Sequence, residues 1–277
     1  MGQNCGVPEW TFDALVDDVA ARKRRAADAR FGKATPQPGV PTPREVFLSV
    51  CGEIAEHYIP LGFRYAPSGP RLTRKPSGSE FTHRLSFYSS HYNVAGEPVV
   101  VDVYAGVSST RFKKWQADNP LGGLNPEPDD MVISGNLGNL QTDPQFLKWD
   151  VPASGEDRAT AVADIIAHID RIGLPFFTAF DDPAGVAAHI EATGAWPCKT
   201  TLTNQARILL YLTGSTESVT SMVRHFLDAN QLWDAYSEAV HALVDGTAQG
   251  NAWPVQAARI ASQIGVELGA GDRRAER

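Results

Sequence analysis

The sequence has little cysteine and no long apolar run, and each shortage excludes a class of protein. Its 277 residues contain three cysteines, Cys5, Cys51 and Cys198. An odd number at such wide spacing, without a CxxC pair, is typical of free thiols rather than of a disulfide framework or a zinc knuckle. No run of about 18 apolar residues is present, so we expect no membrane-spanning helix. The first residues lack the basic start and apolar core of a secretory signal, and we therefore expect a cytoplasmic protein.

Basic charge is the second shortage. Lysine and arginine total 25 against 32 aspartates and glutamates, which gives a formal net charge of −7. Residues 1–120 carry 15 basic and 12 acidic side chains, whereas residues 121–277 carry 10 and 20. The stretch Arg22–Arg25 is the only concentrated basic patch. Because affinity for a phosphate backbone depends on many lysine and arginine contacts, we expect no nucleic-acid partner.

Sequence signatures of catalysis are absent as well. The chain contains no GxSxG, HExxH, P-loop or GxGxxG motif, and these patterns mark nucleophile, zinc, phosphate and dinucleotide sites. His168 and Asp170 are two residues apart, as are His189 and Glu191. This spacing points the two side chains of each pair to different sides of a helix, so neither pair can hold a metal. We expect no cofactor and no metal, and the sequence leaves open whether any reaction is catalysed.

What the sequence does contain predicts an α+β protein: a helix, then an antiparallel β-meander, then a C-terminal helical segment packed on the sheet. The expected parts are residues 1–40 (a helical arm and linker), 41–195 (an α+β domain) and 196–277 (the helical segment). Thr42 and Pro43 are a capping residue and a first-turn proline at the start of the first helix of the domain. Short alternating segments, separated by turn residues, follow it and predict the meander.

Helical periodicity begins near residue 154, where Ser154 is the expected N-cap, and continues to the C-terminal region. The helices expected there span residues 182–193, 202–212, 216–228, 230–244 and 254–268. No clear repeat signature accompanies them.

The N-terminal arm is amphipathic. Within residues 11–30, the apolar residues Phe12, Leu15, Val16 and Val19 recur at helical spacing. A linker with four prolines and two glycines, "FGKATPQPGVPTP", follows. Docking of this arm on another copy of the chain would make the protein a homo-oligomer.

The central part of the chain resembles a bacterial family of unknown function, domain-of-unknown-function family 4304. The resemblance covers about residues 42–190. It is carried by Leu61-Gly62-Phe63, Arg74, Phe87, Ser89, Ser90, Asn93, Gly106, Trp149, Leu174-Pro175-Phe176 and Phe180. It implies a helix ending in Leu-Gly-Phe, then an antiparallel sheet, then helices, and it implies no catalytic residues. At the position of Tyr88, members of the family have more amide-like residues. This difference argues against a ligand shared with the family.

Candidate ligand-binding residues come from the expected sheet. Side chains alternate between the two faces of a strand, so Arg84, Ser86 and Tyr88 share one face, and Asp102 and Tyr104 share the corresponding face of the next strand. Together with Arg64, Arg71 or Arg74 from neighbouring strands, these groups suit binding of a carboxylate, a phosphate or a protein loop. The alternative is an ordinary solvated face, or a face covered by the later helices with an ion pair between Arg84 and Asp102 inside.

Two functions are compatible with these patterns. The first is a non-catalytic cytosolic binding protein, such as an immunity or antitoxin-like inhibitor, that uses its acidic helices against a basic protein partner, with Trp233 and Tyr236 as aromatic contacts. The alternative is an enzyme or small-anion-binding protein with its site on the polar sheet face. An excess of arginine over lysine, 18 to 7, favours a bacterial origin with a GC-rich genome.

Overall fold

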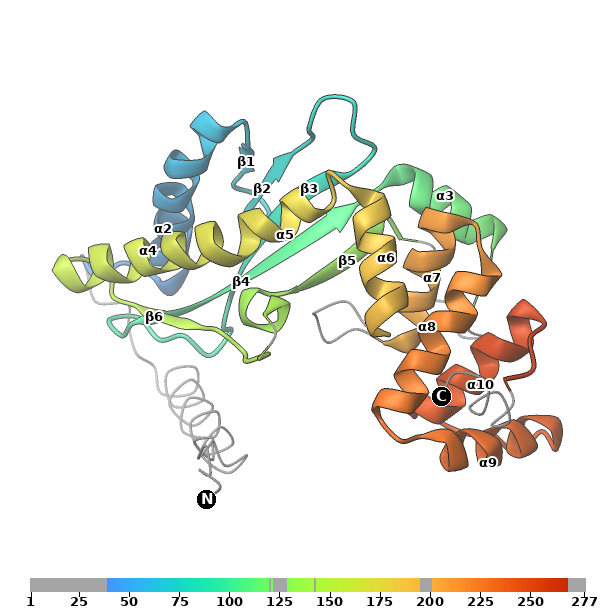
Figure 1. Ribbon diagram of the computed structural model, residues 1–277. Coiled ribbons are helices and arrows are strands. Elements are labelled where there is room, and N and C mark those ends of the chain that lie inside the picture. Colours follow the sequence, from blue (N-terminus) through green and yellow to red (C-terminus); the bar gives the residue numbers. More distant parts are fainter. Residues whose placement is uncertain (1–38, 120, 122–128, 142, 195–200, 269–277) are drawn as a thin grey trace, which may run out of the picture.

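The computed structural model describes residues 39–119, 121, 129–141, 143–194 and 201–268 (Figure 1). Its architecture is α+β, with an antiparallel sheet of six strands and helices that pack on it, as the sequence predicts. The predicted arm and most of its linker lie outside the described residues. Of the described residues, Cys51 is a free thiol and is buried.

The sheet is a meander whose strands pair with their neighbours in sequence. Its order is β1-β2-β3-β4-β5, and β6 pairs with β4. The strands are β1 (Arg64–Ala66), β2 (Arg71–Arg74), β3 (Thr82–Ser89), β4 (Val99–Ser108), β5 (Met131–Asn136) and β6 (Trp149–Val151). Residues 99–101 of β4 pair with β6 and residues 104–108 pair with β5, so these two short strands lie one after the other along the same side of β4.

One face of the sheet, here called the core face, is covered by helices. They are α2 (Pro43–Tyr58), α4 (Glu156–His168), the π-helical turn η3 (Ile169–Gly173) and α5 (Leu174–Ala179). In Figure 1, α4 and α5 run in front of the sheet and α2 lies beside them. The β4 side chains beneath them, Val101, Val103, Ala105 and Val107, are fully buried. Side chains alternate between the two faces of a strand, so every second residue of this part of β4 lies in the main core.

The ends of two helices test the capping predictions. Thr42 and Glu45 form a reciprocal capping box at the start of α2, with Pro43 in the first turn, so that prediction is confirmed. The predicted N-cap Ser154 is wrong. Gly155 occupies the N-cap position of α4, with a φ of 89°, and no side chain caps the helix there. The left-handed conformation of this residue favours glycine and explains the entry into α4 without a hydroxyl cap.

The helices of the C-terminal half form within a few residues of their predicted positions. They are α6 (Pro183–Thr193), α7 (Leu202–Thr213), α8 (Thr216–Ala229), α9 (Trp233–Val244) and α10 (Trp253–Ile264). They contact the sheet region through α5, which α6 follows directly, and through α3 (Thr110–Asp118), which follows β4. Tyr211 of α7 packs against Phe112 and Trp115 of α3, with ring centroids 5.0 and 5.5 Å apart. Its hydroxyl also contacts the carboxylate of Glu80, which precedes β3.

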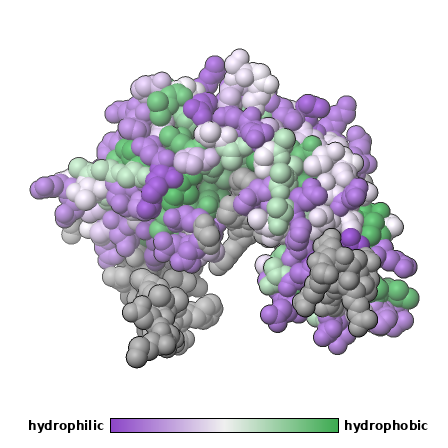
Figure 2. All heavy atoms as spheres, viewed as in Figure 1, coloured by the Kyte–Doolittle hydropathy of each residue, from purple (hydrophilic) through white to green (hydrophobic). Residues whose placement is uncertain are grey.

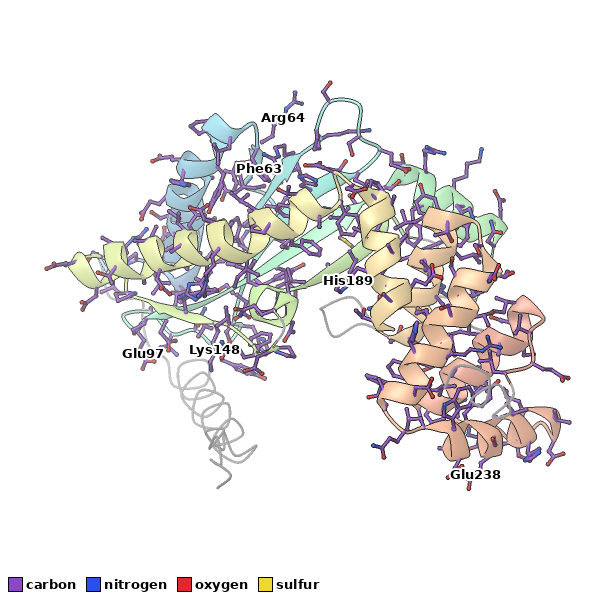
Figure 3. All side chains as sticks on the ribbon, in the orientation of Figure 1. Phe63, Arg64, Glu97, Lys148, His189 and Glu238 are labelled. Carbon is purple, nitrogen blue, oxygen red and sulfur yellow. The ribbon has the colours of Figure 1, made fainter. Side chains whose placement is uncertain are left out.

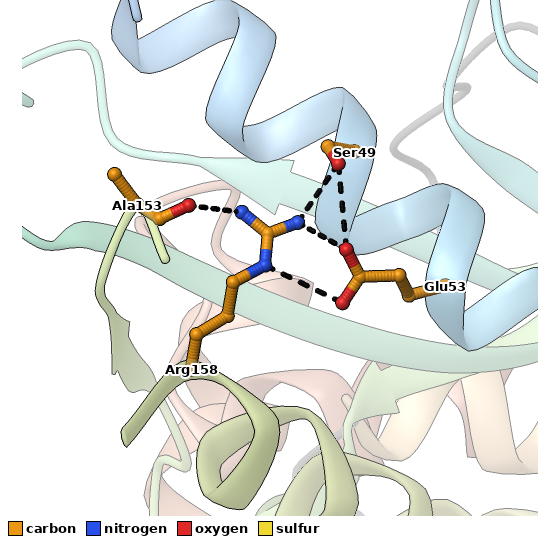
Figure 4. A network of polar contacts seen from close by, with 4 residues as sticks. All are labelled: Ser49, Glu53, Ala153 and Arg158. Carbon is orange, nitrogen blue, oxygen red and sulfur yellow. Dashed lines mark hydrogen bonds and ion pairs between the residues drawn. The ribbon is translucent and has the colours of Figure 1, made fainter. Parts of the chain in front are cut away.

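A polar network joins α2 to α4 across the edge of the core (Figure 4). The Arg158 guanidinium donates to the Ser49 hydroxyl at 2.8 Å and to the Ala153 carbonyl at 2.7 Å. It also forms an ion pair with Glu53. The Arg158 side chain is 11% exposed, so its charge is largely removed from water and depends on these acceptors.

We expect Arg158→Ala to lower the free energy of unfolding by about 2 kcal/mol, because hydrogen bonds to a charged group and the packing of its stem are lost together. Chemical denaturation would measure this change. Arg171→Ala is the matched control, because Arg171 is exposed in η3, which follows α4 directly. Equal effects of the two substitutions would show that the network contributes no special stability.

Candidate functional site

The second face of the sheet, here called the outer face, carries five of the predicted ligand-binding residues. The register between β3 and β4 pairs Tyr88 with Asp102, Ser86 with Tyr104 and Arg84 with Gly106. These positions alternate with the buried Leu85 and Phe87 of the core face. The side chains of Arg84, Ser86, Tyr88, Asp102 and Tyr104 therefore lie together on the outer face.

Arg74 does not share this face, contrary to the sequence-based prediction. It pairs with His83 across β2 and β3, so it lies on the core face. Its Nη2 is 3.3 Å from His83 Nδ1, and its guanidinium carbon is 4.9 Å from the centre of the Phe63 ring. If the pairing of β2 with β3 were shifted by one residue, Arg74 would lie on the outer face instead.

Two other arginines occupy the outer face in its place. Arg71 pairs with Ser86, and Arg64 pairs with Thr73, which in turn pairs with Arg84. Both are exposed, and Arg64 extends away from the sheet in Figure 3. Within the part of the chain that the structure describes, neither has an ion-pair partner. They give this side of the outer face an unneutralised positive charge.

Three aromatic rings form a cluster on the outer face, here called the aromatic cluster: Tyr88, Tyr104 and Phe146. Tyr88 and Tyr104 meet edge to face with centroids 5.2 Å apart, and Tyr104 and Phe146 do so at 6.5 Å. Tyr88 is 54% exposed and Phe146 is 53% exposed. Large apolar surface therefore stays open to solvent on the same face as the two arginines, which is typical of contact sites rather than of a solvated sheet.

Phe146 lies in an irregular segment, and its position depends on Asn136 at the end of β5. The Asn136 side chain is fully buried, and it forms hydrogen bonds with the backbone of Leu147 as a neighbouring strand would. Its amide donates to the Leu147 carbonyl at 2.8 Å, and its oxygen accepts from the Leu147 N–H at 2.8 Å. Because both backbone groups of Leu147 are bound, the neighbouring Phe146 is held in place against Tyr104. Sequence reasoning missed Phe146 because the segment has no periodic pattern.

The ion pair between Arg84 and Asp102, which belonged to the alternative interpretation of the sequence, does not form. Arg84 forms its ion pair with Asp130, with Nη2 and Oδ2 3.3 Å apart, and not with Asp102. Burial raises the pKa of Asp102, and Lys148 partly opposes this rise. The Oδ1 atom of Asp102 is buried without a hydrogen-bond partner among the described residues. Burial also raises the pKa of Tyr104, with smaller contributions from Asp102 and Tyr88. A carboxyl group of this kind resists ionisation more than an exposed aspartate does.

The predicted partner contacts Trp233 and Tyr236 lie inside the C-terminal helices. They are 7% and 4% exposed, and the Trp233 indole donates to Asp228 at 2.6 Å. Several acids of this half also serve internal contacts. Asp164 accepts from the Trp149 indole at 2.7 Å, and Asp182 caps α6. These three acids therefore lie on different elements and are engaged in contacts within the protein.

Other classes of site find little support among the described residues. In this part of the chain, no group of three or more histidine, cysteine, aspartate or glutamate side chains is arranged to hold a metal ion. None of the described helices is long and apolar enough to cross a membrane. No family model, curated protein or solved structure matches the chain. The resemblance to family 4304 therefore stays a prediction, and the outer face must be interpreted from its own chemistry.

Proposed function

We propose that this protein is a non-catalytic binding protein that holds a protein partner on the outer face of its sheet. The aromatic cluster is the observation that carries the proposal. Tyrosine and arginine contribute disproportionately to the binding energy of protein interfaces, and here Tyr88 lies near Arg71 on one face. The hydrogen bonds of Asn136 fix Phe146 before any partner arrives, and such preorganisation lowers the entropy cost of binding.

The charge of the outer face supports a partner segment with acidic groups. Arg64 and Arg71 are exposed, while Asp130 is engaged by Arg84. A planar guanidinium can bind a carboxylate through two parallel hydrogen bonds. This differs from the sequence-based hypothesis of a basic partner on the acidic helices, because Trp233 and Tyr236 are buried. An inhibitory role of the immunity or antitoxin kind, in a bacterial cytoplasm, remains part of this proposal.

We expect the double substitution Tyr88→Ala and Phe146→Ala to abolish capture of the partner. The reason is that both rings are exposed in the free protein and would be buried in the complex. Affinity capture from native lysate, with quantitative mass spectrometry, would compare the wild type, this variant and the control Ile59→Ala. Ile59 is 51% exposed and lies outside the sheet, so its truncation removes similar apolar surface elsewhere.

The fold of each variant would be checked by circular dichroism, since the exposed rings contribute little to the core. A partner that the double variant retains as well as the control would contradict the proposal. The same holds if the wild type enriches no protein over a blank matrix.

The alternative function, a small-anion-binding protein or an enzyme, is favoured by Asp102. Its carboxyl group has a raised pKa and lies between Tyr88 and Tyr104, where it could exchange a proton with a bound ligand. Arg71 and Arg84 would hold the anion. Binding of inorganic phosphate to the wild type, and its loss in Arg71→Ala, would favour this alternative over a protein partner.

A further inference from the structure

The geometry of the aromatic cluster indicates which kind of chemical group the outer face receives. Tyr104 is the middle ring and is partly buried. Its plane lies at 79° to that of Tyr88 and at 69° to that of Phe146. Rings at such steep angles do not cover each other's faces as stacked rings do. Tyr88 and Phe146 are also more than half exposed, so a group placed against the cluster meets open aromatic surface.

A carboxyl group lies directly beside these rings. Asp102 pairs with Tyr88 across β3 and β4, and it is two residues from Tyr104 on the same face of β4. Its side chain is partly buried, and its Oδ1 atom has no hydrogen-bond partner among the described residues. Burial raises the pKa of Asp102, which means that its ionised form is poorly stabilised. A positive charge brought next to this carboxyl group would stabilise the ionised form.

Open aromatic rings beside a carboxyl group are the combination that recognises organic ammonium groups. The face of a tyrosine or phenylalanine ring attracts a cation that lies within about 6 Å of its centre, and quaternary ammonium ligands are bound in this way. Exposed apolar surface alone does not have this property. Figure 2 shows hydrophobic residues at the surface where α9 and α10 lie, and Val244 there is 81% exposed. An aliphatic side chain of this kind has no aromatic face to offer a cation.

The protein has a cation of its own near this carboxyl group. Lys148 directly precedes β6 and is exposed, and Figure 3 shows it near that strand. Its charge lowers the pKa of Asp102, but burial has the larger effect. Lys148 therefore neutralises Asp102 only in part. An incoming ammonium group would compete with Lys148 for the same carboxylate, so removal of Lys148 should strengthen its binding.

We propose that the aromatic cluster and Asp102 bind the ammonium group of a lysine, plain or methylated, of the protein partner. The assignment of this group to a protein rests on the proposed function. Arg71 pairs with Ser86, which pairs with Tyr104, so Arg71 and Tyr104 are two strands apart, about 10 Å between their backbones. A partner segment that carries a lysine and an acidic residue at about this separation would contact the aromatic cluster and Arg71 together.

An NMR titration of the full chain with choline would test the site. We expect choline to bind at least about tenfold more tightly than dimethylbutanol, its uncharged carbon isostere. Tyr104→Leu and Asp102→Asn should each weaken choline binding about fivefold, and Lys148→Met should strengthen it about threefold. Asp102→Asn keeps the shape of the side chain, so its effect reports the charge. Trp253→Ala is the control, because Trp253 is an aromatic residue of α10 that is 48% exposed, and it should leave binding unchanged.

Displacement of the captured partner identifies the source of the ammonium group. Excess choline should release the partner from the immobilised wild type, whereas dimethylbutanol should not. Equal affinity for the two probes, or choline binding that Asp102→Asn leaves unchanged, would overturn the proposed site. A partner that choline does not displace would overturn the assignment to a lysine and leave the proposed function intact. Choline binding without any captured protein would contradict the proposed function and the lysine, while the ammonium site itself would stand.

Discussion

Gly138→Ala should lower the free energy of unfolding by about 3 kcal/mol or more, one of the largest effects expected for a single methyl group in this protein. A Cβ atom on Gly138 would lie 1.9 Å from the carbonyl oxygen of Gln145 and 2.7 Å from Leu147 Cγ. The backbone of Gln145 cannot yield easily, because its N–H donates to the Gly138 carbonyl at 3.2 Å. The added methyl group must push the whole segment that carries Phe146 away from the sheet.

Denaturant unfolding would measure the global effect, and hydrogen exchange of the Leu147 amide would measure the local one. This amide is bound to the Asn136 side chain, so its exchange should accelerate when the segment moves. Gly52→Ala is the control. Gly52 lies within α2, where an added Cβ meets no atom within 4 Å, and alanine favours a helix. Unchanged stability and exchange in Gly138→Ala would show that the contact with Gln145 is not maintained in solution.

The elements of the fold could be predicted because each has a local cause. The α2 cap at Thr42 and the alternating apolar residues of β4 are properties of a few neighbouring residues, and both predictions are confirmed. The error at Ser154 has a local cause too. A hydroxyl residue is a good N-cap, but Gly155 follows it and adopts a conformation with positive φ that begins the helix one residue later.

The candidate site could be predicted only in part, because it depends on contacts between distant residues. Alternation along β3 and β4 correctly predicts that Arg84 and Asp102 share a face, but it cannot say that Arg84 pairs with Asp130. The face of Arg74 depends on the register of β2, which no local pattern fixes. Phe146 depends on Asn136, ten residues earlier. The sequence feature that could have indicated this contact is "GNLG" at residues 135–138, because Asn136 and Gly138 both contact the segment that contains Phe146.

Because His83 is buried, we expect the free energy of unfolding to decrease as the pH falls from about 6.5 to about 4. Its side chain is fully buried, and its ring stacks on Phe177 with centroids 4.7 Å apart. Nδ1 faces Arg74, while Nε2 is buried without a hydrogen-bond partner among the described residues. The pKa of His83 is lowered to about 4, mainly by burial and also by Arg74, while Asp181 partly opposes this shift. A proton on this ring would be placed next to a guanidinium and away from water.

The direction of the pH effect follows from where the proton binds. Above pH 6.5 the ring is neutral in both states, and its contribution to stability is complete. Between pH 6.5 and about 4 the unfolded chain binds a proton that the folded protein does not, so the free energy of unfolding falls, by about 3 kcal/mol in total. Denaturation of the wild type and of His83→Phe at several pH values would isolate this effect, because phenylalanine keeps the ring stack without the titration. The exposed His91 provides the control His91→Gln, whose pH dependence should match the wild type. If His83→Phe loses stability as steeply as the wild type over this range, protonation of His83 is not the cause.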